Sequence, residues 1–217
     1  MIRTLVPALV FALAAPAFAK GGDAPKAAPK AAEVKAAPTV WEIDGAHSAA
    51  TFAVRHMMVS NVRGEFGKVS GSVTVPGADF TKATVEATID AGSINTRNEK
   101  RDGHLKSPDF FDVAKFPTLT FKSKKIERSG AGHKMTGDLT IRGVTKEVVF
   151  DVEGPSAEAK NPWGVVVVGA SATAKINRKE FGLNWNKALE AGGVVVGEEV
   201  TITLDIELNR KAAEAKK

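Results

Sequence analysis

The strongest constraint on the fold is a strict alternation of apolar and polar residues that recurs along the chain. In VTITLDIELN, residues 200–209, every second residue is aliphatic, and the residues between are Thr, Asp, Glu or Asn. Segments 83–90, 134–142 and 146–154 repeat the pattern. Because side chains alternate between the two faces of a β-strand, each segment has one apolar and one polar face. One buried and one wet face is typical of antiparallel sheet, so the pattern predicts an all-β protein.

The number of such segments favours a closed barrel. Further strand candidates are 40–43, 49–55, 64–75, 118–126 and 163–176, separated by turn signals such as VPGAD and RSGAG. About eight long amphipathic strands favour an antiparallel up-and-down barrel over a sandwich, because closure leaves no exposed edge. The interior of such a barrel is filled by side chains or holds one small ligand. The alternation does not decide between these two outcomes.

A short helical excursion near residues 96–112 interrupts the strands. Asn95 or Thr96 can cap its start, and Glu99 stands in the capping-box position relative to Thr96. Ser107 and Pro108 have the types expected at the cap and first position of a second short turn. The sequence therefore predicts a helical connection between two strands, at a mouth of the barrel.

Three phenylalanines, Phe110, Phe111 and Phe116, stand in this connection. Connections usually run over the surface and are polar, so clustered aromatic side chains there need an apolar surface to face. They either fill the end of an ordinary core or close over a ligand. The sequence pattern around them does not decide between these two outcomes.

The two flanks of the chain differ from the barrel segment. Residues 1–19 have an early Arg, an apolar run and an Ala-Phe-Ala cleavage site, as in a secretory signal peptide. Residues 20–38 are rich in Ala, Pro and Lys and predict a disordered linker, and 210–217 form a charged tail. The domain proper is expected at 39–209, where 21 Lys and Arg face 22 Asp and Glu. A net charge of −1 gives no basic face for nucleic acid.

Several kinds of chemistry lack their usual residues. There is no Cys, so disulfides, thiolate metal sites and a Cys nucleophile are excluded. The four histidines show no metal-binding spacing, and no G-x-S-x-G or phosphate-binding loop occurs. No segment after the signal peptide is long enough for a membrane-spanning helix. We therefore expect no enzyme activity, no metal and no cofactor.

Four blocks resemble the YceI-like family of polyisoprenoid-binding periplasmic proteins, in the order found in that family. They are IDGAHSAATFAVRHMMVSNVRGEFGKVSG, INTRNEKRDGHLKSPDFFDVAKFPTLTF, MTGDLTIRGVTKEV and INRKEFGL. The resemblance extends from Trp41 to Glu207. It implies a lipocalin-like barrel whose apolar tunnel holds a long isoprenoid chain, and a periplasmic location. With this resemblance we favour the interpretation that Phe110, Phe111 and Phe116 form a lid that contacts the ligand.

The ligand-binding candidates fall into two groups, one apolar and one polar. The apolar candidates on the inward strand faces and the helical connection are Phe52, Val54, Phe66, Val85, Ile89, Leu105, Phe110, Phe111, Phe116, Phe121, Leu139, Ile141 and Phe150. The polar candidates for holding a ligand head group are His47, His56, Arg97 and Arg101. Plain core packing, and for Arg101 a network with Asp102, are the structural alternatives.

These features predict an exported protein that sequesters or carries a prenyl-quinone or polyprenyl chain. The alternatives are a binder of fatty acids or amides, a hydrolase or isomerase acting on such a lipid, and a filled-core stress or interaction protein. The segment GVVVVG, 164–169, is apolar on both faces, which predicts either a covered strand or the seam of a homodimer.

Overall fold

The computed structural model describes residues 37–190 and 192–212, which belong to one compact unit. The predicted signal peptide lies outside the described residues. The same holds for residues 20–36 of the predicted linker and 213–217 of the predicted tail. Within the described ranges, no helix combines the length and the apolar character needed to cross a membrane.

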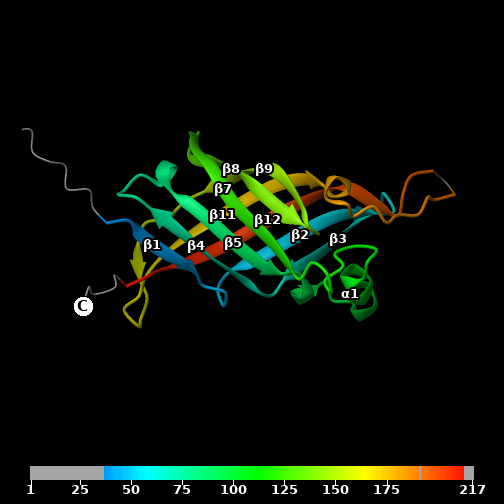
Figure 1. Ribbon diagram of the computed structural model, residues 1–217, viewed down its shortest axis with the longest axis horizontal. Coiled ribbons are helices and arrows are strands. Elements are labelled where there is room, and N and C mark those ends of the chain that lie inside the picture. The colour runs from blue at the N-terminus through cyan, green and yellow to red at the C-terminus, as the bar shows by residue number, and fades with distance from the viewer. Residues whose placement is uncertain (1–36, 191, 213–217) are drawn as a thin grey trace, which may run out of the picture. The chain divides into compact units, whose positions relative to one another are not determined.

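Residues 37–190 and 192–212 form a closed antiparallel barrel, as the alternation predicts, with one short α-helix among these residues (Figure 1). Its strands are β1 (Thr39–Ile43), β2 (Ala49–His56), β3 (Ser60–Phe66), β4 (Val69–Val75), β5 (Thr84–Asp90), β6 (Ile94–Asn95), β7 (Thr118–Ser129), β8 (Gly132–Ile141), β9 (Val144–Glu153), β10 (Ala159–Lys160), β11 (Val166–Asn177) and β12 (Val196–Arg210). Its helix is α1 (Glu99–Lys106), and 3₁₀ turns are η1 (Phe80–Lys82), η2 (Ala91–Ser93) and η3 (Arg178–Phe181).

Eight strand positions make up the ring. β1 and β2 lie end to end along one edge of β12, β3 and β4 follow each other in the next position, and β5 and β6 share the third. β7, β8, β9, β11 and β12 fill the others in chain order. β12 closes the ring because it pairs with β11 on its other edge. Closure satisfies the backbone groups that an open sheet would leave unpaired at its edges.

The segment 64–75, predicted as one strand, is split at Gly67 and Lys68 into β3 and β4. The backbone N–H of each of these two residues turns to Ser93 of η2 instead of continuing the ladder. The neighbouring position is interrupted at the same level, between β1 and β2. Such interruptions bend strands and increase local twist, which period-two alternation alone does not reveal.

The helical connection forms where it was predicted, but its cap differs. Asn98 caps α1, and its side-chain oxygen accepts a hydrogen bond from the Arg101 backbone N–H at 3.0 Å. The predicted cap Thr96 is buried and binds the Asp102 carboxylate instead. The capping-box prediction was wrong because Asp102, one turn into the helix, competes for the Thr96 hydroxyl.

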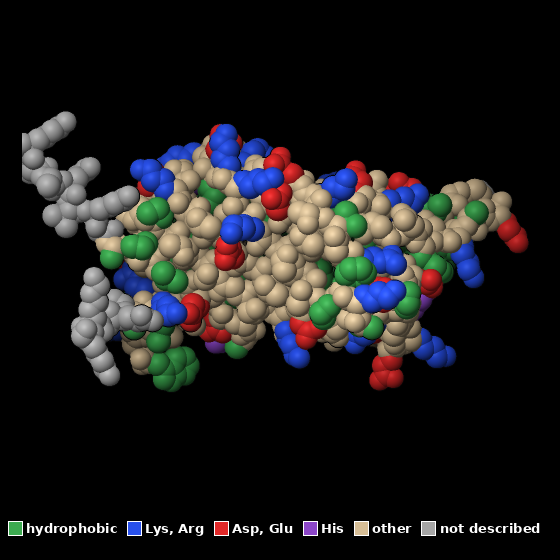
Figure 2. All heavy atoms as spheres, in the orientation of Figure 1, with side chains coloured by type: hydrophobic (Ala, Val, Ile, Leu, Met, Phe, Trp, Pro, Cys, Tyr) green, Lys and Arg blue, Asp and Glu red, His purple; other side chains and the backbone are tan. Residues whose placement is uncertain are grey.

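The inward faces of the strands form the core. Met135, Leu139 and Ile141 of β8 are buried, as are Phe150 and Val152 of β9. On the outer surface, Lys and Arg side chains are interspersed with Asp and Glu (Figure 2). Ion pairs such as Lys122–Glu86 and Lys134–Asp151 join neighbouring strands there.

Candidate ligand-binding site

A cavity of about 230 Å³ lies inside the barrel. Its lining extends from Ile43 and Leu208 near one end to Leu183 and Val196 near the other. Thr51, Thr120, Ser171 and Arg178 are the polar members of this lining, and the remaining members are apolar. An apolar wall binds by the area it removes from water, so this cavity suits a hydrocarbon chain.

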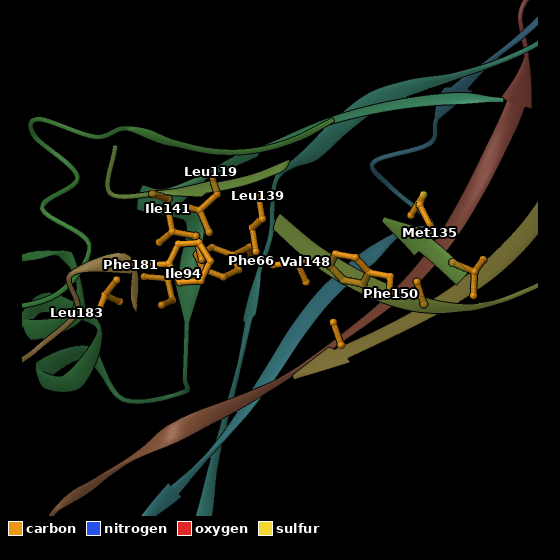
Figure 3. Packing of buried hydrophobic residues seen from close by; sticks show 14 of the residues in the cluster. Phe66, Ile94, Leu119, Met135, Leu139, Ile141, Val148, Phe150, Phe181 and Leu183 are labelled. Carbon is orange, nitrogen blue, oxygen red and sulfur yellow. The ribbon is translucent and has the colours of Figure 1, made fainter. Parts of the chain in front are cut away.

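Twelve of the thirteen apolar candidates line this cavity. They are Phe52, Val54, Phe66, Val85, Ile89, Leu105, Phe110, Phe111, Phe121, Leu139, Ile141 and Phe150. Figure 3 shows part of the surrounding cluster, which runs from Leu183 and Phe181 beside α1 to Met135 and Phe150. Whether each side chain contacts a ligand stays a prediction.

Phe116 is the candidate that does not line the cavity. Its ring packs against Gly143, at the place where any larger residue would put its Cβ. Arg142 and Gly143 form the β8–β9 turn with positive φ angles of 51° and 73°. Phe116 therefore packs against this turn and not into the cavity.

Aromatic rings occupy much of the interior, and glycines make room for them. The Phe66 ring centroid lies 5.9 Å from that of Phe52 and 5.7 Å from that of Phe111, while Phe121 and Phe150 form a second pair at 5.2 Å. The Phe52 ring lies where Gly64 has no side chain. Cavities that hold small molecules usually measure about 300–1,000 Å³. A long chain therefore fits only if some of these rings rotate.

One end of the barrel is covered by the α1 connection and η3. Phe110 is buried, with its ring 5.0 Å from His104 and 5.4 Å from Trp185. Arg142 holds two covering segments together, because its guanidinium donates to the Pro108 carbonyl at 2.7 Å and to the Gly182 carbonyl at 2.6 Å. The sequence offered no signal for this role of Arg142, since RG reads only as a turn.

Arg97 and Arg101, two of the polar candidates, lie away from the cavity. Arg101 donates to the Thr96 hydroxyl at 2.7 Å and the Thr96 carbonyl at 2.8 Å, which ties α1 to the chain entering it. Arg97 lines a larger groove of about 420 Å³ with Arg63 and Glu65. That groove is polar, so its greater volume does not make it the better site for an apolar chain.

The two histidines among the candidates also lie outside the lining. His56 ends β2 and pairs with Ser60 of β3 and Val196 of β12. His47 is on the exposed connection between β1 and β2, where its Nδ1 lies 3.1 Å from the Asp44 carboxylate and 3.9 Å from that of Glu207.

The hydrogen bond from His47 is the main cause that lowers the pKa of Asp44 to about 2, and the Ala46 N–H and the Asn209 amide add to it. Asp44 in turn raises the pKa of His47. The side chains of Asp44, His47 and Asn209 are thus already hydrogen-bonded within this cluster. The neighbouring Ser48 hydroxyl bonds the backbone carbonyl and N–H of Glu207. His47 and Ser48 therefore do not form a base and nucleophile pair. The cluster of Asp44, His47, Asn209 and Glu207 instead stabilises the β1–β2 connection.

Arg178, the first residue of η3, is a cavity residue that the sequence pattern does not indicate. This residue is 4 % exposed and lines the cavity, and its guanidinium donates to the Gly197, Leu183 and Val196 carbonyls. Burial lowers its pKa, against the opposing effect of Glu198. The run NRKE looks like an exposed polar turn, so only its position in the fold reveals a buried arginine.

Comparison with known proteins gives a consistent answer. A family model described as YceI-like domain matches residues 41–208. A UPF0312 protein of Staphylococcus aureus strain USA300 is 44 % identical over 172 residues, covering 79 % of this chain and 98 % of the relative.

Two solved structures share the fold. The Campylobacter jejuni YCEI protein has 32 % identity and a TM-score of 0.58, over 73 % of this chain and 90 % of that one. A polyisoprenoid binding domain from Saccharophagus degradans has 16 % identity and a TM-score of 0.57, over 79 % and 98 %.

Proposed function

This chain belongs to the YceI-like family, and on that basis we propose that it is an exported protein that holds an isoprenoid-type lipid inside its barrel. The observation that carries the proposal is the cavity, which runs along the barrel and is lined almost entirely by hydrocarbon. A solved relative of the same fold is a polyisoprenoid binding domain, which supports an isoprenoid over other chains.

Binding needs movement at the covered end. The closing segments, 107–112 and 178–183, are attached to the barrel by side-chain hydrogen bonds and not by strand ladders. Arg142 donates to a carbonyl in each segment, and Arg178 donates to the Gly197 and Val196 carbonyls of β12. Segments with few ladder bonds open at lower free energy than strands do. We expect the lipid to enter and leave there, and we expect no chemical turnover.

Export is proposed from the signal-peptide pattern of residues 1–19 and from the resemblance of this chain to a family of periplasmic proteins. Mature protein from the native host should begin at Lys20. An intact Met1 on exported material would overturn this part of the proposal.

The binding proposal is tested by lipid extraction from protein purified from its native host without detergent. Mass spectrometry should find an isoprenoid lipid at close to one molecule per protein. A fatty acid or amide at that stoichiometry would show that the ligand is another amphiphile and not an isoprenoid. Protein that carries no lipid, and takes none up from mixed lipid extracts, would contradict the function.

A further inference from the structure

Arg178 is the one charged residue among those lining the cavity in the described part of the chain. It sits at the covered end, where β11 passes into η3, and the bulged start of β12 lies against it. The wall from there to Leu208 is apolar apart from hydroxyl-bearing residues. The cavity thus has one cationic end and a long apolar remainder.

The charge of Arg178 is not balanced by a carboxylate. Its three bonds go to backbone carbonyls, which are neutral. Glu198 is the group whose charge acts on it, but the Glu198 carboxylate is on the outer surface and is bound to Lys179 at 2.5 Å. No ion pair involves Arg178 within residues 37–190 and 192–212. A buried charge without a partner is costly, so a ligand that supplies one gains affinity.

The guanidinium also has donors to spare. It carries five N–H groups in a planar fork, and the three backbone bonds occupy three of them. Two remain, one on each terminal nitrogen. This fork suits the paired oxygens of a carboxylate or phosphate better than a single hydroxyl.

We propose that Arg178 binds the anionic head group, a carboxylate or phosphate, of a single-chain amphiphile whose tail extends along the cavity toward Leu208. This rests on the proposed lipid-binding function and assigns the ligand's polar end and its direction. The head then lies under η3, and the tail follows the inward face of β12.

The test compares ligands that differ only at the head. Equilibrium dialysis of the mature protein at pH 8 uses oleate with oleyl alcohol, and geranylgeranyl phosphate with geranylgeraniol. We expect at least a tenfold preference for the anion in one pair, and the pair that shows it separates carboxylate from phosphate. Arg178→Met should abolish the preference while alcohol binding persists, and Arg63→Met, on the exposed outer groove, should retain it.

Each other outcome has a definite meaning. Equal binding of acid and alcohol by the unmodified protein, or an unchanged preference in Arg178→Met, overturns the assignment to Arg178 but leaves lipid binding intact. No binding of any of the four ligands overturns both proposals.

A second measurement does not depend on the variant folding. Oleate labelled with ¹³C at its carboxyl is titrated while bound to the unmodified protein. A guanidinium beside the carboxylate favours the ionised form, so the bound carboxyl should titrate at lower pH than in detergent micelles. Titration at the same or a higher pH would contradict the proposal.

Discussion

The two ends of the barrel are closed in different ways. At the strand-closed end, the central plug residue is held by paired strands, because Trp41 faces Arg210 of β12 and Val73 of β4 across the ladders, and Phe80 of η1 packs against the same cluster. The Arg210 guanidinium covers the Trp41 ring at 4.8 Å from its centroid. At the helix end, the plug comes from segments inserted between strands, chiefly Phe110 and Phe181.

This difference bears on how the cavity can open. Moving Trp41 away from the strand-closed end requires breaking β1 from both of its neighbours. At the helix end, the covering segments can move while the ladders stay paired. Opening free energy follows the contacts that must be lost, so the helix end is the expected passage for a ligand.

The largest effect is expected from removing one plug at each end. Phe181 is 1 % exposed and Trp41 6 %, so Phe181→Ala and Trp41→Ala should each lower the free energy of unfolding by about 3–5 kcal/mol. Urea unfolding measures the loss. Stopped-flow lipid exchange should be faster in Phe181→Ala and nearly unchanged in Trp41→Ala. Equally faster lipid exchange in both variants would contradict the proposal that the ligand passes through the helix end.

Arg142→Met should have a smaller effect on stability and a clear one on exchange. Hydrogen bonds to charged groups contribute about 1.5–3 kcal/mol each, and solvent near this half-buried side chain reduces that, so we expect a loss of about 1–3 kcal/mol. Lipid should exchange faster because Arg142 no longer joins the closing segments 107–112 and 178–183. Arg63→Met, on the exposed outer groove, is the matched control and should leave both quantities unchanged.

Phe116→Ala tests whether Phe116 lies outside the lipid-binding site. Its ring is half-buried, packs against the β8–β9 turn and does not line the cavity, so the variant should lose less stability than Phe181→Ala and retain its full lipid content. Lipid stoichiometry and unfolding are measured on the same sample. Loss of lipid without loss of stability would place Phe116 in the site after all.

The smallest effect expected is the pH dependence of the stability that the Asp44–His47 pair contributes at the β1–β2 connection. The pKa of Asp44 is lowered to about 2, so its contribution is present above pH 4 and disappears as the pH falls toward 2. The pKa of His47 is raised, so its contribution is complete below its unfolded value of 6.5 and is lost as the pH rises through the folded value.

The stability difference between the unmodified protein and His47→Gln should therefore be greatest between about pH 4 and 6.5. Both groups are exposed, so the difference should be small and should shrink in high salt. A difference that grows above pH 8 would contradict this account of the pair.

The sequence predicts much of the barrel because its periodicity directly encodes which face of each strand is buried. Alternation alone places Leu139, Ile141 and Phe150 in the interior, and the structure has them there. The breaks at Gly67 and between β1 and β2 escaped prediction, because they depend on which strands meet at the same level.

The polar side of the site was much harder to predict. Arg97 and Arg101 stand in recognisable blocks, but one lies on the outer groove and the other serves the α1 connection. Arg178 looked like part of a solvated turn. A buried charge is identified by the carbonyls around it, and those come from residues 183, 196 and 197, which the sequence gives no reason to bring together.

Native mass spectrometry of a variant blocked inside the barrel tests most directly whether the lipid occupies the cavity. Ala172 of β11 lines the cavity, and Ala172→Phe fills its middle at an overpacking cost of about 1–3 kcal/mol. Ala53→Phe adds the same side chain on the outer groove and serves as the control. After incubation with isoprenoid lipid, the unmodified protein and Ala53→Phe should each carry one molecule, and folded Ala172→Phe should carry none. Full lipid occupancy in folded Ala172→Phe would contradict binding inside the barrel.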